Sequence, residues 1–142
     1  RDFARFHPGG SLGKRLYTRV SDVYDGTNRP CITREAGIRP VILAMSKGRL
    51  GAVAIVDGEE RLEGIITDGD LRRMMEKYDD VDGVTAKDVM SKSPKTISED
   101  ELAYNAYRMM EQNSITQLVV VDKDRHYKGM VHIHDILREG VV

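Results

Sequence analysis

The sequence predicts an α/β fold built as a tandem β-α-β-β-α repeat with pseudo-two-fold symmetry. Two observations carry this prediction. A 21-residue segment recurs at a constant offset of 65 residues, and each copy alternates short β-branched runs with helical periodicity. The 142 residues suffice for one compact domain with a core. We divide them into a linker over 1–20, a first repeat over 21–80 and a second repeat over 81–142.

The repeat becomes visible when residues 51–71 are aligned with residues 116–136. Identical residues then coincide: Val56 with Val121, Asp57 with Asp122, Gly64 with Gly129, and Asp70 with Asp135. A unit of about 60 residues would by itself bury only about 60% of its unfolded surface. We therefore expect the two copies to pack face to face through their sheets and to share one core.

Each copy is expected to open with a short extended piece, which begins at a proline, and then a helix. In the first copy, Pro40 suits a first helical turn because no N–H is needed there, and Gly48 suits the helix end. In the second copy, Ser98 and Glu101 have the S-x-x-E spacing of a capping box. The second helix is therefore expected to begin there and to end near Asn113.

Two strands and a short helix complete each copy. The predicted strands are β-branched-rich, are joined by polar turns, and cover 52–57, 62–66, 117–122 and 127–132. The closing helices are expected over 69–78 and 134–139, with residues 79–85 as the hinge between the copies.

Composition excludes several classes of function. The 22 basic and 23 acidic residues leave a net charge of -1, which gives no reason to expect non-specific binding to nucleic acid or to an anionic membrane. The single cysteine, Cys31, excludes an intrachain disulfide and fits a reducing compartment such as the cytoplasm. No apolar run approaches the ~18 to 20 residues of a membrane-spanning helix. Nothing resembles a nucleophile with its base.

Residues 7–16, HPGGSLGKRL, contain a Gly-Lys pair like that of a phosphate-binding P-loop. The first glycine of G-x-x-x-x-G-K-[ST] would stand at Pro8, and the hydroxyl residue would stand at Arg15. The preceding residues are too few and too charged for a buried strand. We interpret the stretch as a connector that enters a helix.

Thr67 and Asp70 stand where a strand meets a helix, and they are the first candidates for a ligand site. Their T-x-x-D spacing suits a helix cap that needs no ligand. The same geometry also suits an anion site, in which a carboxylate accepts the hydroxyls of a ribose. The residues alone leave both interpretations open.

The second copy departs from this pattern because His132 replaces Thr67. We expect that His132 cannot cap as threonine does, which argues against a second phosphate site of the same kind. His132 and His134 are expected to line a cleft shared with Thr67 and Asp70, and to hydrogen-bond an anionic ligand. Two histidines with Asp135 do not make a specific metal signature, so no metal and no required cofactor is expected.

The repeat, with the run Gly64-Ile65-Ile66-Thr67-Asp68-Gly69-Asp70, resembles a pair of CBS domains, the cystathionine-β-synthase module, over roughly residues 20–140. The resemblance implies that the threonine and the aspartate of this motif contact phosphate and ribose. The predicted ligand-binding set is Thr67, Asp68, Asp70, His132, His134 and Asp135.

Four stretches in order also resemble the D-arabinose-5-phosphate isomerase family: DFA at 2–4, HPGGSLG at 7–13, TDGDLRR at 67–73 and HDILREG at 134–140. In that family the HPGG stretch joins an N-terminal sugar-isomerase domain to a C-terminal CBS pair. The resemblance implies that residues 1–20 are this linker. It also implies that His7 is catalytic only in the parent enzyme, so the fragment alone is not expected to be an enzyme.

The resemblance implies a regulatory module in an isomerase that interconverts D-ribulose 5-phosphate and D-arabinose 5-phosphate. Such an enzyme feeds the synthesis of 3-deoxy-D-manno-octulosonate (Kdo) for lipopolysaccharide or capsule. The expected regulatory ligand is CMP-Kdo. The alternatives are an adenosine-nucleotide energy sensor and a structural oligomerisation module without ligand. We expect a homodimer through the CBS pairs, a tetramer in the parent, and methionines (Met74, Met75, Met109, Met110) that fill the core or form a subunit contact.

Overall fold

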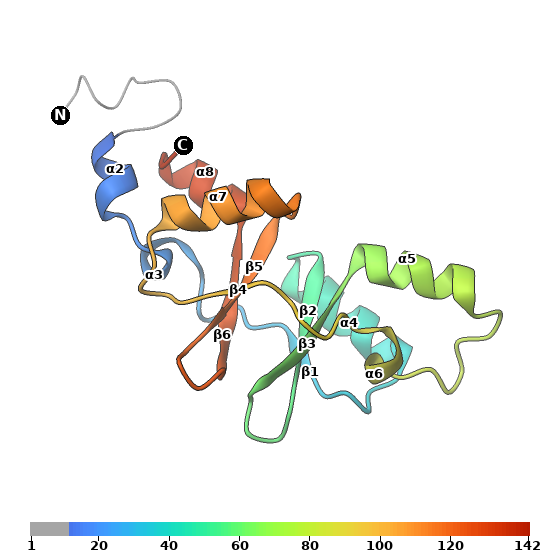
Figure 1. Cartoon of the computed structure of the whole chain (residues 1–142). Helices are drawn as coiled ribbons and strands as arrows, with labels where there is room; N and C mark the ends of the chain where they lie inside the picture. Colours follow the sequence, from blue (N-terminus) through green and yellow to red (C-terminus); the bar gives the residue numbers. More distant parts are fainter. Residues whose placement is uncertain (1–11) are drawn as a thin grey trace.

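A computed structural model describes residues 12–142, and it contains two three-stranded sheets of identical topology (Figure 1). In the first sheet, β1 (Cys31–Ile32) pairs in parallel with β2 (Ala52–Val56), which pairs antiparallel with β3 (Leu62–Thr67). In the second sheet, β4 (Thr96–Ile97), β5 (Gln117–Val121) and β6 (Tyr127–His132) repeat this arrangement. The predicted tandem α/β repeat is confirmed.

Helices follow the strands in the predicted order. The first repeat carries α4 (Ile38–Gly48) and α5 (Asp68–Lys77), and the second carries α7 (Ala103–Asn113) and α8 (Ile133–Glu139). The shorter helices are α2 (Leu12–Tyr17), α3 (Val20–Val23) and α6 (Ala86–Val89). No helix within residues 12–142 is long and apolar enough to cross a membrane.

The two sheets enclose a shared apolar layer. It contains Ala52, Ala54, Val56, Leu62 and Ile65 from the first sheet, and Val119, Val121, Tyr127 and Met130 from the second. The intervening strand residues, such as Val53 and Leu118, pack with the helices on the other face of each sheet. Because both faces of β2 and β5 are buried, these strands are continuous apolar runs rather than alternating ones.

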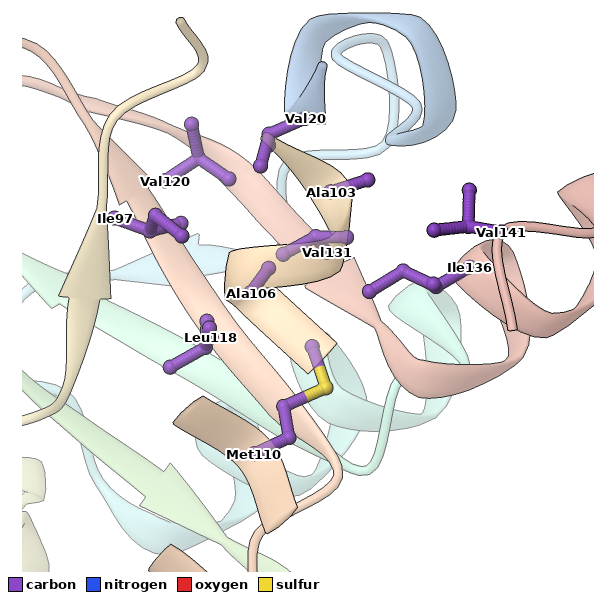
Figure 2. Close-up of a cluster of buried hydrophobic side chains, with 10 residues drawn as sticks. All are labelled: Val20, Ile97, Ala103, Ala106, Met110, Leu118, Val120, Val131, Ile136 and Val141. Atoms are coloured by element: carbon purple, nitrogen blue, oxygen red, sulfur yellow. The ribbon is translucent and has the colours of Figure 1, made fainter. Parts of the chain in front are cut away.

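The helices α3 and α6 are exchanged between the repeats. Val20 of α3 precedes the first repeat, yet it is fully buried in the core of the second beside Ala103 and Val131 (Figure 2). Ala86 of α6 lies in the second repeat, ahead of its strands, yet it is buried in the core of the first. Each repeat is therefore completed by a helix from outside its own sheet-and-helix unit. The domain boundaries at residues 20 and 80 stay a prediction.

The helix α7 begins later than predicted, at Ala103. Ser98 Oγ accepts the N–H of Asp100 at 3.1 Å, which closes a turn rather than a helix. The prediction of a capping box formed by Ser98 and Glu101 was therefore wrong. The physical reason is α3, because the Val20 N–H donates to the Glu101 carbonyl at 2.8 Å and holds this backbone outside the helix.

The helices α4 and α7 end at their predicted positions, Gly48 and Asn113, and the residue that follows each of them is the C-cap. Gly48 is the last helical residue, and its lack of a side chain permits close approach, since a Cβ there would lie 2.6 Å from Pro30 Cβ. The left-handed residue that caps α4 is Arg49, with φ 59°. The equivalent Ser114 caps α7 with φ 53°.

The helices α5 and α8 begin with equivalent capping boxes. At α5, the Asp70 N–H donates to Thr67 Oγ1 at 3.3 Å, and the Thr67 N–H donates to Asp70 Oδ2 at 2.9 Å. At α8, the His134 N–H donates to His132 Nδ1 at 3.1 Å, and the His132 N–H donates to Asp135 Oδ2 at 2.9 Å. The prediction that His132 cannot cap was wrong, because an unprotonated ring nitrogen accepts a hydrogen bond as a hydroxyl oxygen does.

The cap requires His132 in its neutral form. Burial lowers the pKa of His132 below its ordinary value of 6.5, and the nearby His134 lowers this pKa further. Since Nδ1 accepts the helix N–H, the proton of the neutral ring lies on Nε2.

We expect this cap to make the stability of the protein depend on pH. The pKa of His132 is lower in the folded chain than in the unfolded chain, so the unfolded state binds more protons below about pH 6.5. The stabilising contribution is complete above that pH and is lost as the pH falls through the folded pKa. Urea unfolding between pH 7.5 and pH 5 measures this loss. His132→Thr, which copies the cap of the first repeat, should flatten the dependence, and an unchanged dependence would contradict this account.

Candidate functional site

A single cleft of about 890 Å³ opens beside the ends of β3 and β6. This volume lies in the range of roughly 300–1,000 Å³ that is usual for small-molecule sites. All six predicted ligand-binding residues line it: Thr67, Asp68, Asp70, His132, His134 and Asp135. The structure thus brings together two motifs that lie 65 residues apart. His7, the predicted catalytic residue of the parent, lies outside the described residues.

The carboxylate of Asp70 is fully occupied by internal hydrogen bonds. Its side chain is only 7% exposed. It accepts from the Thr67 N–H at 2.9 Å and from Thr67 Oγ1 at 3.1 Å. It also accepts from Arg73 Nη2 at 2.6 Å and from Ser91 Oγ at 3.3 Å. A carboxylate offers about four lone-pair positions, so none remains for a ligand while Arg73 and Ser91 stay in place.

Asp135, the equivalent carboxylate of the second repeat, has free acceptor capacity. It accepts from the His132 N–H at 2.9 Å and from Arg138 Nη2 at 2.7 Å. Its side chain is 17% exposed. About two of its four lone-pair positions are therefore left for donors such as the two hydroxyls of a ribose.

Two imidazoles stand beside this open carboxylate. The rings of His132 and His134 meet edge to face, with centroids 4.8 Å apart. With Nδ1 of His132 engaged in the cap, its Nε2–H remains as a donor for an anionic or carbonyl oxygen. The side chains in residues 12–142 whose ligand atoms are close enough to share a metal ion are Asp122, Asp124 and His126, in the turn between β5 and β6 and outside the cleft.

The sequence suggests Arg73 as a possible phosphate or carboxylate contact, but sequence reasoning missed the other cationic side chains of the cleft wall. Arg49, Arg73, Lys95 and Arg138 all line the cleft. Arg73 and Arg138 pair with the aspartates three residues before them. Within residues 12–142, neither Arg49 nor Lys95 has an ion pair, so both leave positive charge available to an anionic ligand. Both lie in connecting segments, and no motif marks either of them.

A second T-x-x-D capping box shows what this spacing specifies by itself. Thr85 and Asp88 cap α6, with the Thr85 N–H donating to Asp88 Oδ2 at 2.9 Å. Asp88 lies outside the cleft. The spacing alone therefore specifies a helix cap. The capping box of Thr67 and Asp70 differs because β3 ends where the second repeat closes a cleft, so this box forms part of the cleft wall.

Comparison with known proteins finds the CBS domain family twice, over residues 20–77 and 86–141. The arabinose 5-phosphate isomerase KpsF of Escherichia coli is 43% identical over 134 residues, which cover 94% of this chain and 41% of KpsF. The arabinose 5-phosphate isomerase KdsD of Yersinia pestis is 41% identical over 142 residues, which cover 99% of this chain and 43% of KdsD. The chain thus spans about two fifths of the length of these relatives.

Solved structures share the fold. The CBS domain pair of protein MJ0100, in complex with 5′-methylthioadenosine and S-adenosyl-L-methionine, superposes with a TM-score of 0.75 at 26% identity, covering 86% of this chain and 98% of that one. The CBS domain protein PAE2072 from Pyrobaculum aerophilum, complexed with AMP, gives 0.72 at 26% identity, with 83% and 89% covered. Since one family accounts for both repeats and for their arrangement around a common core, this chain belongs to the CBS domain family, as a CBS-domain pair.

Proposed function

We propose that this CBS-domain pair is a regulatory module that binds an anionic nucleotide in the cleft between its repeats. One observation carries the proposal: both motifs and four cationic side chains line the same cleft. The adenosine compounds named in the structures of MJ0100 and PAE2072 support the nucleotide class. An adenosine nucleotide is accordingly the second candidate ligand.

In its finer form, the proposal names CMP-Kdo as the ligand. The second motif has lost its hydroxyl and gained two imidazoles, so two identical nucleotide sites are not expected. The open carboxylate of Asp135 suits the ribose diol. Cationic side chains and the His132 Nε2–H suit a ligand that carries both a phosphate and a sugar carboxylate.

We infer that the parent protein is an arabinose 5-phosphate isomerase. The identity of about 40% to KpsF and KdsD supports this, and the chain would then be its regulatory part. The parent would act in the cytoplasm, in Kdo synthesis for lipopolysaccharide or capsule. The module would then allow CMP-Kdo, a late product of the pathway, to inhibit an isomerase that acts early in it.

Self-association is part of the same proposal. Met74 and Met110 are buried in the core, whereas Met75 on α5 is 64% exposed. Ile42 and Leu43 on α4 are also exposed large apolar side chains. A homodimer that covers these helices, and a tetramer in the parent, would remove this apolar surface from water.

A ligand panel tests the proposed function. At a concentration near 100 Kd, a ligand that binds only the folded protein adds about 2.7 kcal/mol of stability. For a chain of this size, that is roughly 5–15 °C in Tm. We expect CMP-Kdo to produce this shift and adenosine, which has no anionic group, to produce little. A Tm shift with AMP or ATP but not with CMP-Kdo would show that the ligand is an adenosine nucleotide. No Tm shift with any nucleotide would show that the module is structural and binds no nucleotide.

A second prediction separates ligand contact from helix capping. Asp135→Asn should weaken nucleotide binding by about tenfold or more, because hydrogen bonds to a charged acceptor are worth about 1.5–3 kcal/mol. Asp88→Asn is the matched control, since Asp88 occupies the same position of a capping box outside the cleft. Both variants should lose up to ~1 kcal/mol of stability. Equal nucleotide affinity of the two variants in titration calorimetry would show that Asp135 does not contact the ligand.

A further inference from the structure

Four residues other than glycine adopt left-handed backbone conformations within residues 12–142. They are Arg49 (φ 59°), Glu60 (φ 63°), Ser114 (φ 53°) and Arg125 (φ 67°). They form two pairs at the offset of 65, so the repeat preserves the backbone conformation while the side chain changes. Glycine adopts this conformation without a steric penalty, and it is the usual residue one position beyond a helix end. A non-glycine residue at such a place lowers the stability of the fold, which raises the question of what its side chain does.

The backbone of Glu60 and Arg125, the pair in the hairpin turns, connects the two repeats. The Arg125 carbonyl accepts the Leu62 N–H, and the Glu60 carbonyl accepts the Tyr127 N–H, both at 2.9 Å. These reciprocal hydrogen bonds join the repeats. The turns lie at the opposite end of the sheets from α5 and α8 (Figure 1), and neither Glu60 nor Arg125 lines the cleft.

Arg49 is in a different position. Its N–H donates to the Met45 carbonyl at 3.1 Å, which ends the helix as a glycine would. Its exposed side chain lines the cleft, together with Lys95 and the residues of both motifs. Within residues 12–142 its guanidinium has no ion pair. At the equivalent position, Ser114 also lines the cleft but brings no charge.

We propose that Arg49 binds the anionic group of the cleft ligand, a phosphate or a sugar carboxylate. This inference rests on the proposed nucleotide-binding function and adds a residue that no motif contains. Guanidinium is suited to the task because its planar donors match both kinds of oxyanion. The alternative is that the positive charge only favours the C-terminal end of the α4 dipole, which would make Arg49 a structural residue.

Stability and binding should respond to Arg49→Gly with opposite signs. Glycine removes the left-handed strain, so we expect Tm without ligand to rise by about 2–4 °C. Loss of the guanidinium should weaken CMP-Kdo binding by about tenfold in titration calorimetry. Arg125→Gly is the matched control, because it makes the same residue change at another left-handed backbone position, outside the cleft. It should raise Tm and leave the affinity for CMP-Kdo unchanged. Arg49→Lys retains the charge and should recover most of the binding.

The choice of ligand separates the two anionic groups. If Arg49 holds the phosphate, Arg49→Gly weakens AMP and CMP-Kdo alike; if it holds the sugar carboxylate, only CMP-Kdo is weakened. Wild-type affinity of Arg49→Gly for both ligands would overturn the inference and leave the proposed function standing. A fall in Tm for Arg49→Gly would assign Arg49 to the helix end and also overturn it. Absence of binding to the wild-type protein would overturn the inference together with the proposed function.

Discussion

The apolar layer between the two sheets determines where both motif loops lie. β3 and β6 each bury side chains in this layer, and each ends at the N-cap of a helix. At the other end of the sheets, the reciprocal hydrogen bonds of Leu62 with Arg125 and of Tyr127 with Glu60 fix the register. A slip of one residue in either strand would move its buried side chains to the opposite face. The cleft is thus a consequence of how the two sheets meet.

The exchange of α3 and α6 makes the two repeats one structural unit. Val20 completes the core of the second repeat, and Ala86 completes the core of the first. Neither repeat therefore contains all of its own core. A ligand held by both motifs would stabilise an arrangement that the apolar layer, the turns and the exchanged helices already favour. This coupling suits a module that reports ligand binding to a larger protein.

Much of the fold could be predicted because apolar periodicity and the internal repeat are local signals. The strands β2, β3, β5 and β6 and the helices α5 and α8 lie within one residue of their predicted positions. The start of α7 could not be predicted, because its apparent cap at Ser98 is overridden by a backbone hydrogen bond from Val20. The cap formed by His132 was missed because capping rules count oxygen acceptors. The six motif residues could be placed in one cleft from the sequence. No sequence motif predicts that Arg49 lines the same cleft, because its position depends on where α4 ends and on a cleft wall that the other repeat forms.

We propose that one ligand contacts both repeats, although their motifs differ in chemistry. Asp70 is occupied by internal donors, whereas Asp135 keeps free acceptor positions, and the cationic side chains come from both repeats. Two-dimensional ¹H–¹⁵N NMR during titration with CMP-Kdo, and with AMP in parallel, tests this most directly. We expect the backbone signals of residues 67–70 and 132–135 to shift together and to saturate with a single Kd, while those of the turns at 57–61 and 122–126 stay in place. Shifts confined to one motif, or two motifs that saturate with separate affinities, would contradict it.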